Sequence, residues 1–224
     1  MDLVLASRSP RRHDLLSLTG LQFRVVTPEM DETQQPGETP ETYARRLSQQ
    51  KAEAAASLLD EPALVLAADT IVVDGEDVLG KPADATEARV TLRRLRGRTH
   101  HVMTGVTLLD TSSGRRLTGL VTSPVPMRRY TDEEIEAYIA SGDPFDKAGA
   151  YGIQNEAFHP VENFEHCYSN VMGLPLCHVT RMLRSFGVEL PVDVAGACAE
   201  ALGYVCPIFD DVLASRYEPP DRRV

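Results

Sequence analysis

The hydrophobic residues follow two patterns along the chain. Some form short runs of consecutive apolar residues, and others recur at the spacing of one face of a helix. Residues 3–6 and 64–68 are wholly apolar, which is typical of strands buried on both faces of an α/β sheet. Two longer strands are predicted over 99–109 and 116–126, joined by a turn at 112–114. Strands and helices alternate without a regular period, so the pattern predicts an α/β fold with a mixed, twisted sheet and flanking helices.

Start and stop signals delimit the helices. Ser9 before Pro10 predicts an N-cap for a helix over about 10–18. Thr131 and Glu134 form a capping-box pattern. The other predicted helices cover about 40–59, 86–96 with Thr86 as its cap, 132–140, 169–186 and 192–202.

Asp69 is expected at the end of the second strand, directly before a hairpin whose turn lies at 74–77. Pairing Val73 with Val78 across that turn brings Lys81 back toward the strand end. We therefore expect the carboxylate and the ammonium at the same end of one ribbon.

Length and charge limit the function classes. The chain has 224 residues, of which 33 are acidic and 23 basic, giving a net charge of −10. This acidity argues against a nucleic-acid partner, which requires extended basic surface, so a bound anion must meet a local basic cluster. We expect one main domain over 1–187, a C-terminal extension of unknown role over 188–224, and a disordered tail over 217–224.

Neither a membrane span of ~20 apolar residues nor a signal-peptide pattern is visible, so no membrane association and a cytoplasmic location are expected. The four cysteines have no CxxC pairing and are interpreted as reduced, mostly buried thiols. A zinc site that combines them with His166 or His178 is the less favoured alternative, because the spacing is irregular. The adjacent His100 and His101 point to opposite faces of a strand and do not form a metal pair.

A basic cluster occupies the junction between the first strand and the first helix. Backbone N–H groups and the helix dipole favour anions there, and guanidinium groups match phosphate oxygens. The hydroxyls of Ser7 and Ser9 supplement them. The alternative is a solvated basic turn. The cluster consists of Arg8, Arg11, Arg12 and His13.

Four more charged side chains, two acids and two lysines, complete the candidate chemistry. Asp69, at a strand end, suits Mg²⁺ ligation or orientation of a water as general base, with a turn cap as the alternative. Glu32 is a candidate second metal ligand. Lys51 lies on the apolar stripe of its helix, so its ammonium either reaches a polar cleft or extends to solvent. Lys81, in Gly80-Lys81-Pro82, is a candidate cation or a rim lysine.

Together these groups fit a nucleoside triphosphate held through a divalent cation and cleaved by an activated water. The sequence contains neither a GxxxxGK[ST] motif nor a GxGxxG fingerprint, so P-loop and dinucleotide chemistry are not supported.

The ordered motifs of residues 3–186 resemble the Maf-type nucleoside triphosphate pyrophosphatases. They are Ala6-Ser7-Arg8-Ser9-Pro10-Arg11-Arg12, Asp31-Glu32, Lys51-Ala52, Ala68-Asp69-Thr70, Gly80-Lys81-Pro82, Asp146-Lys147-Ala148-Gly149-Ala150-Tyr151-Gly152-Ile153-Gln154 and Asn170-Val171-Met172-Gly173-Leu174-Pro175.

The resemblance implies two lobes around a deep cleft, as in inosine-triphosphate pyrophosphatases. It implies hydrolysis of a nucleoside triphosphate to the monophosphate and pyrophosphate with Mg²⁺ or Mn²⁺, and a possible homodimer. The implied roles are Asp69 as catalytic base; Glu32, Lys51 and Lys81 as the charged catalytic set; Glu32 and Asp69 as metal ligands; Ser7, Ser9, Arg11 and Arg12 at the phosphates; and Arg11, Thr70 and Gln154 in base choice.

The Asp69-Thr70 pair and the segment over 150–154 resemble the branch that acts on dTTP and UTP. Asn155, where that branch usually has glycine, and the loop over 158–167 depart from its pattern. The alternatives are a pyrophosphatase for a modified nucleotide such as 7-methyl-GTP, a nucleotidyltransferase, and a nucleotide-binding regulator of cell division or septum formation.

Overall fold

The computed structural model describes residues 2–214, which form one mixed sheet with helices on both faces. The strand order is β2-β1-β3-β5-β6, with β4 beside β3; β1 runs parallel to β2 and β3, and the remaining pairs are antiparallel. The mixed α/β prediction is confirmed. The strands are β1 (Asp2–Ala6), β2 (Arg24–Val26), β3 (Ala63–Asp74), β4 (Asp77–Leu79), β5 (Thr99–Asp110) and β6 (Arg116–Pro126).

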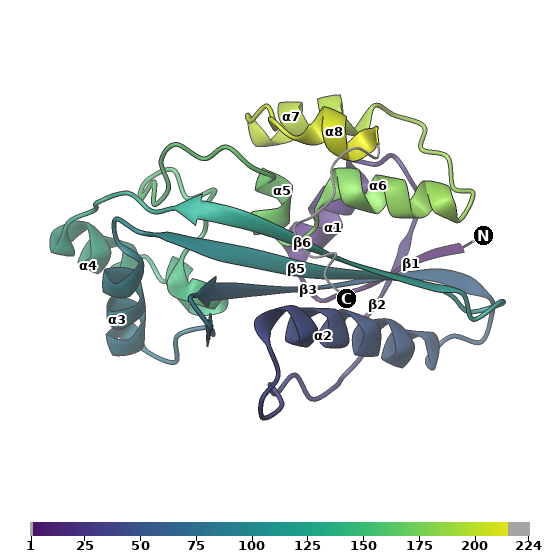
Figure 1. The fold of residues 1–224 in the computed structure, drawn as a ribbon, viewed down its shortest axis with the longest axis horizontal. Coiled ribbons are helices and arrows are strands. Elements are labelled where there is room, and N and C mark those ends of the chain that lie inside the picture. Colours follow the sequence, from purple (N-terminus) through teal and green to yellow (C-terminus); the bar gives the residue numbers. More distant parts are fainter. Residues whose placement is uncertain (1, 215–224) are drawn as a thin grey trace.

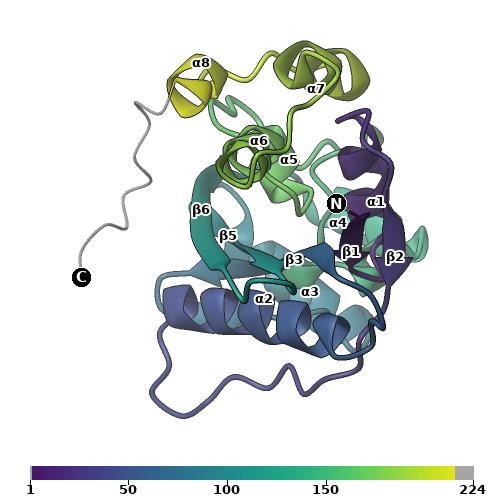
Figure 2. The same ribbon diagram turned by 90° about the vertical axis from the view of Figure 1, so that its right-hand side faces the viewer.

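Helix α2 lies along one face of the sheet, and α5 and α6 lie on the other (Figures 1 and 2). Helices α3 and α4 stand at one end of the long strands, and α7 and α8 form an outer layer beyond α6. The bounds are α1 (Pro10–Ser17), α2 (Pro40–Ala56), α3 (Ala85–Leu95), α4 (Asp132–Ala140), α5 (Tyr168–Val171), α6 (Leu176–Ser185), α7 (Val194–Leu202) and α8 (Phe209–Leu213), with 3₁₀ turns η1 (Asp143–Asp146) and η2 (Ala148–Ala150).

The side-chain alternation of the central strands explains the layers. In β1, Leu3 and Leu5 pack with α1 and α6, while Val4 and Ala6 pack with the alanines of α2. A separate apolar cluster joins α3, α4 and the far ends of β5 and β6. The two lobes are thus two hydrophobic cores at opposite ends of β3 and β5.

Several local predictions are confirmed. Val73 pairs with Val78 across the β3–β4 turn. Thr131 and Glu134 make both hydrogen bonds of the capping box at α4. His100 is buried, whereas its neighbour His101 is exposed.

Two predicted boundaries are wrong. The single helix over 169–186 is two helices, α5 and α6, because Gly173 adopts φ +111° and Pro175 has no N–H to continue the helix. The cap of α3 is Asp84, whose carboxylate accepts from the N–H groups of Thr86 and Glu87, so Thr86 lies inside the helix.

Two short elements, β2 and α8, were not predicted from the sequence. Ser9 occupies the predicted N-cap position of α1, but its side chain makes no capping hydrogen bond. The predicted tail over 217–224 lies outside the described residues. No helix within 2–214 is long and apolar enough to cross a membrane.

Candidate functional site

A gap along one edge of β3 positions the site. β5 pairs with β3 from Leu64 to Val73 on one side. On the opposite edge, β1 pairs with 63–67 and β4 with 72–74, which leaves 68–71 without a strand partner there. Asp69 and Thr70 lie in this gap.

Asp69 is therefore not at a strand end, contrary to the prediction. The β-branched residues Ile71, Val72 and Val73 continue the strand, and β5 accompanies it throughout. What ends near Asp69 is the neighbouring strand: β1 stops at Ala6, which pairs with Ala67.

A cavity of about 380 Å³ opens at the gap. All ten residues for which the family resemblance implies a role line it: Ser7, Ser9, Arg11, Arg12, Glu32, Lys51, Asp69, Thr70, Lys81 and Gln154. Arg8 lines it as well. His13, the remaining member of the basic cluster, is exposed outside it and packs edge-on against Phe23. The predicted convergence is confirmed, while the chemical role of each residue stays a prediction.

Lys51 joins the two acids of the cavity. Its Nζ lies 2.5 Å from Asp69 Oδ1 and 2.9 Å from Glu32 Oε1. Only 12% of the Lys51 side chain and 9% of the Asp69 side chain are exposed, against 52% for Glu32. The ammonium therefore reaches a polar cleft, the first of the two alternatives for this residue.

The charge of Glu32 is stabilised by this arrangement. Partial burial acts to raise the pKa of the Glu32 carboxyl, but the hydrogen bond and charge of Lys51, aided by Lys81, lower it overall. Glu32 thus presents an ionised oxygen to the cavity at neutral pH.

Arg12 is fixed by groups from three parts of the chain. Its Nε donates to the carbonyl of Gly173 at 2.8 Å, its Nη2 to Thr70 Oγ1 at 3.0 Å and its Nη1 to Ser7 Oγ at 3.5 Å. Burial lowers its pKa and the charge of Asp69 opposes that effect, so the guanidinium stays charged. The cavity therefore holds a preoriented cation beside its acids.

Thr70 is occupied within this network. Besides accepting from Arg12, its hydroxyl lies 2.9 Å from Thr104 Oγ1, which donates to the carbonyl of Asn170. The geometry thus gives Thr70 a part in positioning Arg12, in addition to the base-choice role that stays a prediction.

Lys147 is a cavity residue that was quoted in a motif but given no role. It is buried, and its Nζ donates to the carbonyl and carboxylate of Asp143 and to the carboxylate of Asp146. A charged pair followed by the small residues 148–150 is the signal that marks it in the sequence.

Asn155, the departure from the branch pattern, organises its own loop. Its Nδ2 donates to Asp143, and its Oδ1 accepts from the N–H of Phe158. Neighbouring Gln154 is exposed at the cavity wall, where an amide can contact a ligand.

The carboxylates of the cavity suit a divalent cation only if phosphate oxygens complete its coordination shell. Among residues 2–214, no group of three or more His, Cys, Asp or Glu side chains is arranged to hold a metal ion, so the cysteine–histidine zinc alternative finds no support. Glu32 and Asp69, however, both reach Lys51 Nζ, so their oxygens approach one point. Mg²⁺ commonly takes one or two protein carboxylates and completes its shell with phosphate and water oxygens.

Two proteins from other organisms are similar in sequence to most of this chain. A protein from Syntrophus aciditrophicus named dTTP/UTP pyrophosphatase is 45% identical over 185 residues, which are 83% of this chain and 90% of that protein. One from Citrifermentans bemidjiense, also named dTTP/UTP pyrophosphatase, is 46% identical over 185 residues, covering 83% of this chain and 95% of the relative.

Among solved structures, a HAM1 protein from Coxiella burnetii aligns with a TM-score of 0.42 at 20% identity, over 58% of this chain and 74% of that one. The fold assignment rests on the sheet topology described above.

The sequence model of one family, described as Maf-like protein, matches residues 2–186. These residues include every predicted member of the cavity, and the match ends one residue after α6. With the match and the two relatives in agreement, the chain belongs to the Maf-like protein family.

Proposed function

We propose that this protein hydrolyses nucleoside triphosphates, dTTP and UTP foremost, to the monophosphate and pyrophosphate, as nucleotide-pool housekeeping. Two named relatives at 45% and 46% identity support the substrate class. The observation that carries the reaction class is the placement of Asp69, Lys51 and Glu32 in one cavity with the fixed Arg12.

Asp69 is the proposed general base. Its carboxylate is nearly enclosed, and Lys51 holds one of its oxygens. The other oxygen can accept a proton from a water positioned for attack on the α-phosphorus. Lys51 keeps the carboxylate oriented for that transfer.

The cations of the cavity are the proposed phosphate site. Arg12 is held in place before the ligand arrives, so little entropy is lost when it binds. Arg8, Arg11 and Lys81 face the same cavity and can neutralise charge that develops on the departing pyrophosphate. A bound Mg²⁺ or Mn²⁺, held by Glu32 and Asp69, would supply further charge neutralisation.

Gln154 is the proposed contact for the base. Its side-chain amide carries a donor and an acceptor side by side, which matches a pyrimidine edge. Arg11 and Thr70 are assigned to the same end of the ligand on the family resemblance.

The direct test is pyrophosphate release from a panel of nucleoside triphosphates, 7-methyl-GTP included, with Mg²⁺, with Mn²⁺ and with a chelator. We expect turnover of dTTP and UTP in the absence of any acceptor, and its loss on chelation. Tight nucleotide binding without turnover would instead favour a regulator, and release only with an acceptor would favour a nucleotidyltransferase. A preference for 7-methyl-GTP would overturn the substrate assignment and leave the reaction class intact.

A further inference from the structure

The segment that follows α7 lies along the loop that precedes α5. The hydroxyl of Tyr204 donates to the carbonyl of Phe164 at 3.0 Å, and the thiol of Cys206 lies 3.9 Å from the carbonyl of His166. Both contacts join residues 40 positions apart, so the two stretches run side by side in register. Ring contacts of Tyr204 with Phe164 and Tyr168 reinforce this alignment.

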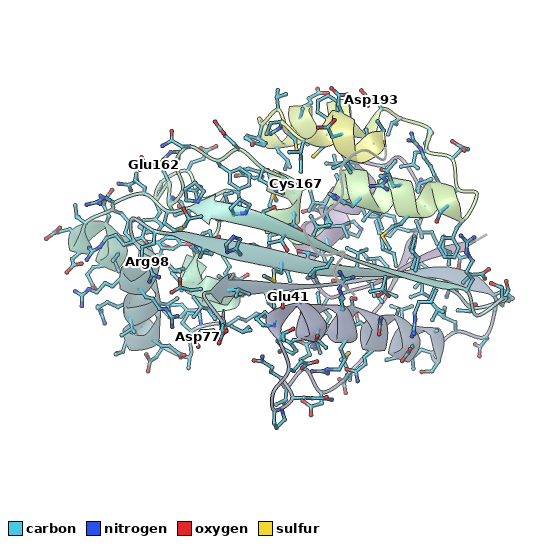
Figure 3. The ribbon with its side chains drawn as sticks, viewed as in Figure 1. Glu41, Asp77, Arg98, Glu162, Cys167 and Asp193 are labelled. Carbon is cyan, nitrogen blue, oxygen red and sulfur yellow. The ribbon has the colours of Figure 1, made fainter. Side chains whose placement is uncertain are left out.

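This register places Cys206 opposite His166 and so next to Cys167, the following residue. Cys167 is buried, lies between the sheet and the α7–α8 layer (Figure 3), and has its Sγ 3.4 Å from Ser169 Oγ. Cys206 is half-buried, and its Sγ lies 3.9 Å from the carbonyl oxygen of His166, the residue directly before Cys167. Cys206 belongs to the C-terminal extension and Cys167 to the part of the chain that the family match covers.

We propose that Cys167 and Cys206 are an oxidisable pair, and that a peroxide converts them into an intramolecular disulfide that fastens the C-terminal extension to the loop before α5. The reaction removes one hydrogen from each thiol and consumes one peroxide. Two thiols and hydrogen peroxide give one S–S bond and two waters, and the two electrons pass from sulfur to oxygen.

The two thiols have different roles in this reaction. The neighbouring Cys167 thiol lowers the pKa of the Cys206 thiol, whereas Cys206 and burial raise the pKa of Cys167. Cys206 is therefore the thiolate that attacks the peroxide oxygen. It becomes a sulfenic acid and expels hydroxide, which takes up the proton that the thiol had lost and gives the first water. The Cys167 sulfur then attacks the sulfenic sulfur, forming the S–S bond and releasing the second water. Only the half-buried partner needs access to the oxidant.

The disulfide would fix a wall next to the nucleotide cavity. A second cavity, of about 600 Å³, is lined by Phe164, Tyr168 and Tyr204, and it shares Gln154 and Met172 with the first. Oxidation would hold Tyr204 against the loop over 164–168 and leave the residues of the catalytic proposal chemically unchanged.

The test is thiol mapping of the full chain. The reduced protein is treated with graded hydrogen peroxide, unfolded, alkylated, digested and analysed by mass spectrometry, with dithiothreitol added back to half of each sample. We expect two fewer alkylated thiols, a cross-linked pair of peptides containing Cys167 and Cys206, and full reversal by dithiothreitol. The oxidised protein should also unfold at a higher temperature.

Cysteine-to-serine variants distinguish the proposed pair from the other two cysteines, Cys177 and Cys198. Cys198→Ser and Cys177→Ser should form the same cross-link, because their thiols are not members of the proposed pair. Cys167→Ser should leave Cys206 as a sulfenic acid that dimedone traps, and Cys206→Ser should give neither product. A cross-link that joins other cysteines, a disulfide between two molecules, or oxidation beyond sulfenic acid without any cross-link in the unsubstituted protein would overturn the proposal. None of these readouts depends on nucleotide hydrolysis.

Discussion

Asp69 keeps a nearly enclosed carboxylate in the middle of a strand, where an ionised group is costly unless it is paired. Lys51 supplies the pairing charge, and Glu32 supplies the second acid that balances that lysine. Each member of the trio is therefore held in place by contact with another member. A change in one of them should alter chemistry more than folding when the shape is preserved.

The first prediction concerns Asp69→Asn, which keeps the shape and removes the charge. We expect kcat for dTTP to fall about 10²–10⁴-fold, because an amide cannot accept the proton of the attacking water. Steady-state pyrophosphate release measures this effect. Asp77→Asn, at an exposed carboxylate on β4, is the matched control and should retain activity. Turnover at the unsubstituted rate would refute the role of Asp69.

The second prediction uses Gly173 to displace Arg12. A Cβ at Gly173 would lie 3.3 Å from Arg12 Nε and 3.4 Å from Thr70 Oγ1, at a backbone φ of +111°. We expect Gly173→Ala to lower kcat/KM for dTTP by about 10-fold or more, because the guanidinium must shift.

Gly187→Ala is its control, since Gly187 also has a positive φ but no atom within 4 Å of the added methyl group. Both variants should lose about 1–2 kcal/mol of stability from backbone strain. Only the first should lose activity, and equal kinetics in the two variants would exclude this role of Gly173.

At the scale of elements, α2 sits unusually close to β5. A Cβ at Gly105 would lie 2.2 Å from the carbonyl oxygen of Ala44, so the helix backbone rests on a strand position without a side chain. Gly105 pairs with Asp69 in the sheet, and Lys51 lies two turns along α2 from Ala44. This contact sets the height of the lysine above its carboxylate.

The third prediction follows from that contact. Gly105→Ala should push α2 outward, cost about 1–3 kcal/mol through overpacking, and lower Tm by about 3–10 °C. Activity should fall as well, because Lys51 moves with the helix. Gly119→Ala on the neighbouring strand meets only Met182 Sδ at 3.8 Å and should unfold close to the unsubstituted Tm. A Gly105→Ala protein as stable as Gly119→Ala would contradict the close approach.

The elements show what the sequence could predict and why. The register of β3 and β4 followed from the turn at 74–77, because a hairpin pairing is local. The strand β2 escaped prediction because its three residues acquire their conformation only by pairing with β1, a long-range contact. Gly173 and Pro175 indicate the break between α5 and α6 in the sequence. The apolar residues around them recur at helical spacing, however, which favoured one continuous helix.

Within the site, residues on regular elements were easier to predict from the sequence than residues in loops. Lys51 was less conspicuous, because a lysine on the apolar stripe of a helix often extends to solvent, and the structure explains its position by its two acids. Its partner Glu32 lies in an irregular loop, where no periodicity marks one acid among many. That loop is tied to α2 by the Tyr43 hydroxyl, which donates to the carbonyl of Glu32 at 2.6 Å. Such a contact depends on the tertiary fold and has no signature in the sequence.

At the scale of the whole molecule, the cavity draws on both lobes. Ser7, Arg12 and Lys51 belong to the lobe of β1 and α2, whereas Lys81 and Lys147 belong to the lobe of α3 and α4. A ligand that contacts both lobes stabilises their native arrangement, since it binds only when the two cores are correctly placed.

The fourth prediction is therefore thermal. An α,β-methylene analogue of dTTP with Mg²⁺, at about 100 times its Kd, should add about 2.7 kcal/mol of stability and raise Tm by roughly 5–10 °C. Thymidine monophosphate at the same concentration should raise it less, because it lacks the two phosphates that the cations would contact. Differential scanning calorimetry makes the comparison, and an equal shift with both ligands would argue against the phosphate site.

Because its guanidinium is fixed, Arg12 cannot move with the negative charge of the leaving pyrophosphate during turnover. An arginine has five N–H donors, and three of these are already given to Gly173, Thr70 and Ser7. The remaining two, one on each terminal nitrogen, suffice for a single phosphate group and cannot swing after it. Any side chain that accompanies the leaving pyrophosphate outward must be a longer-reaching one at the cavity rim, and exposed Lys81 is placed to do so.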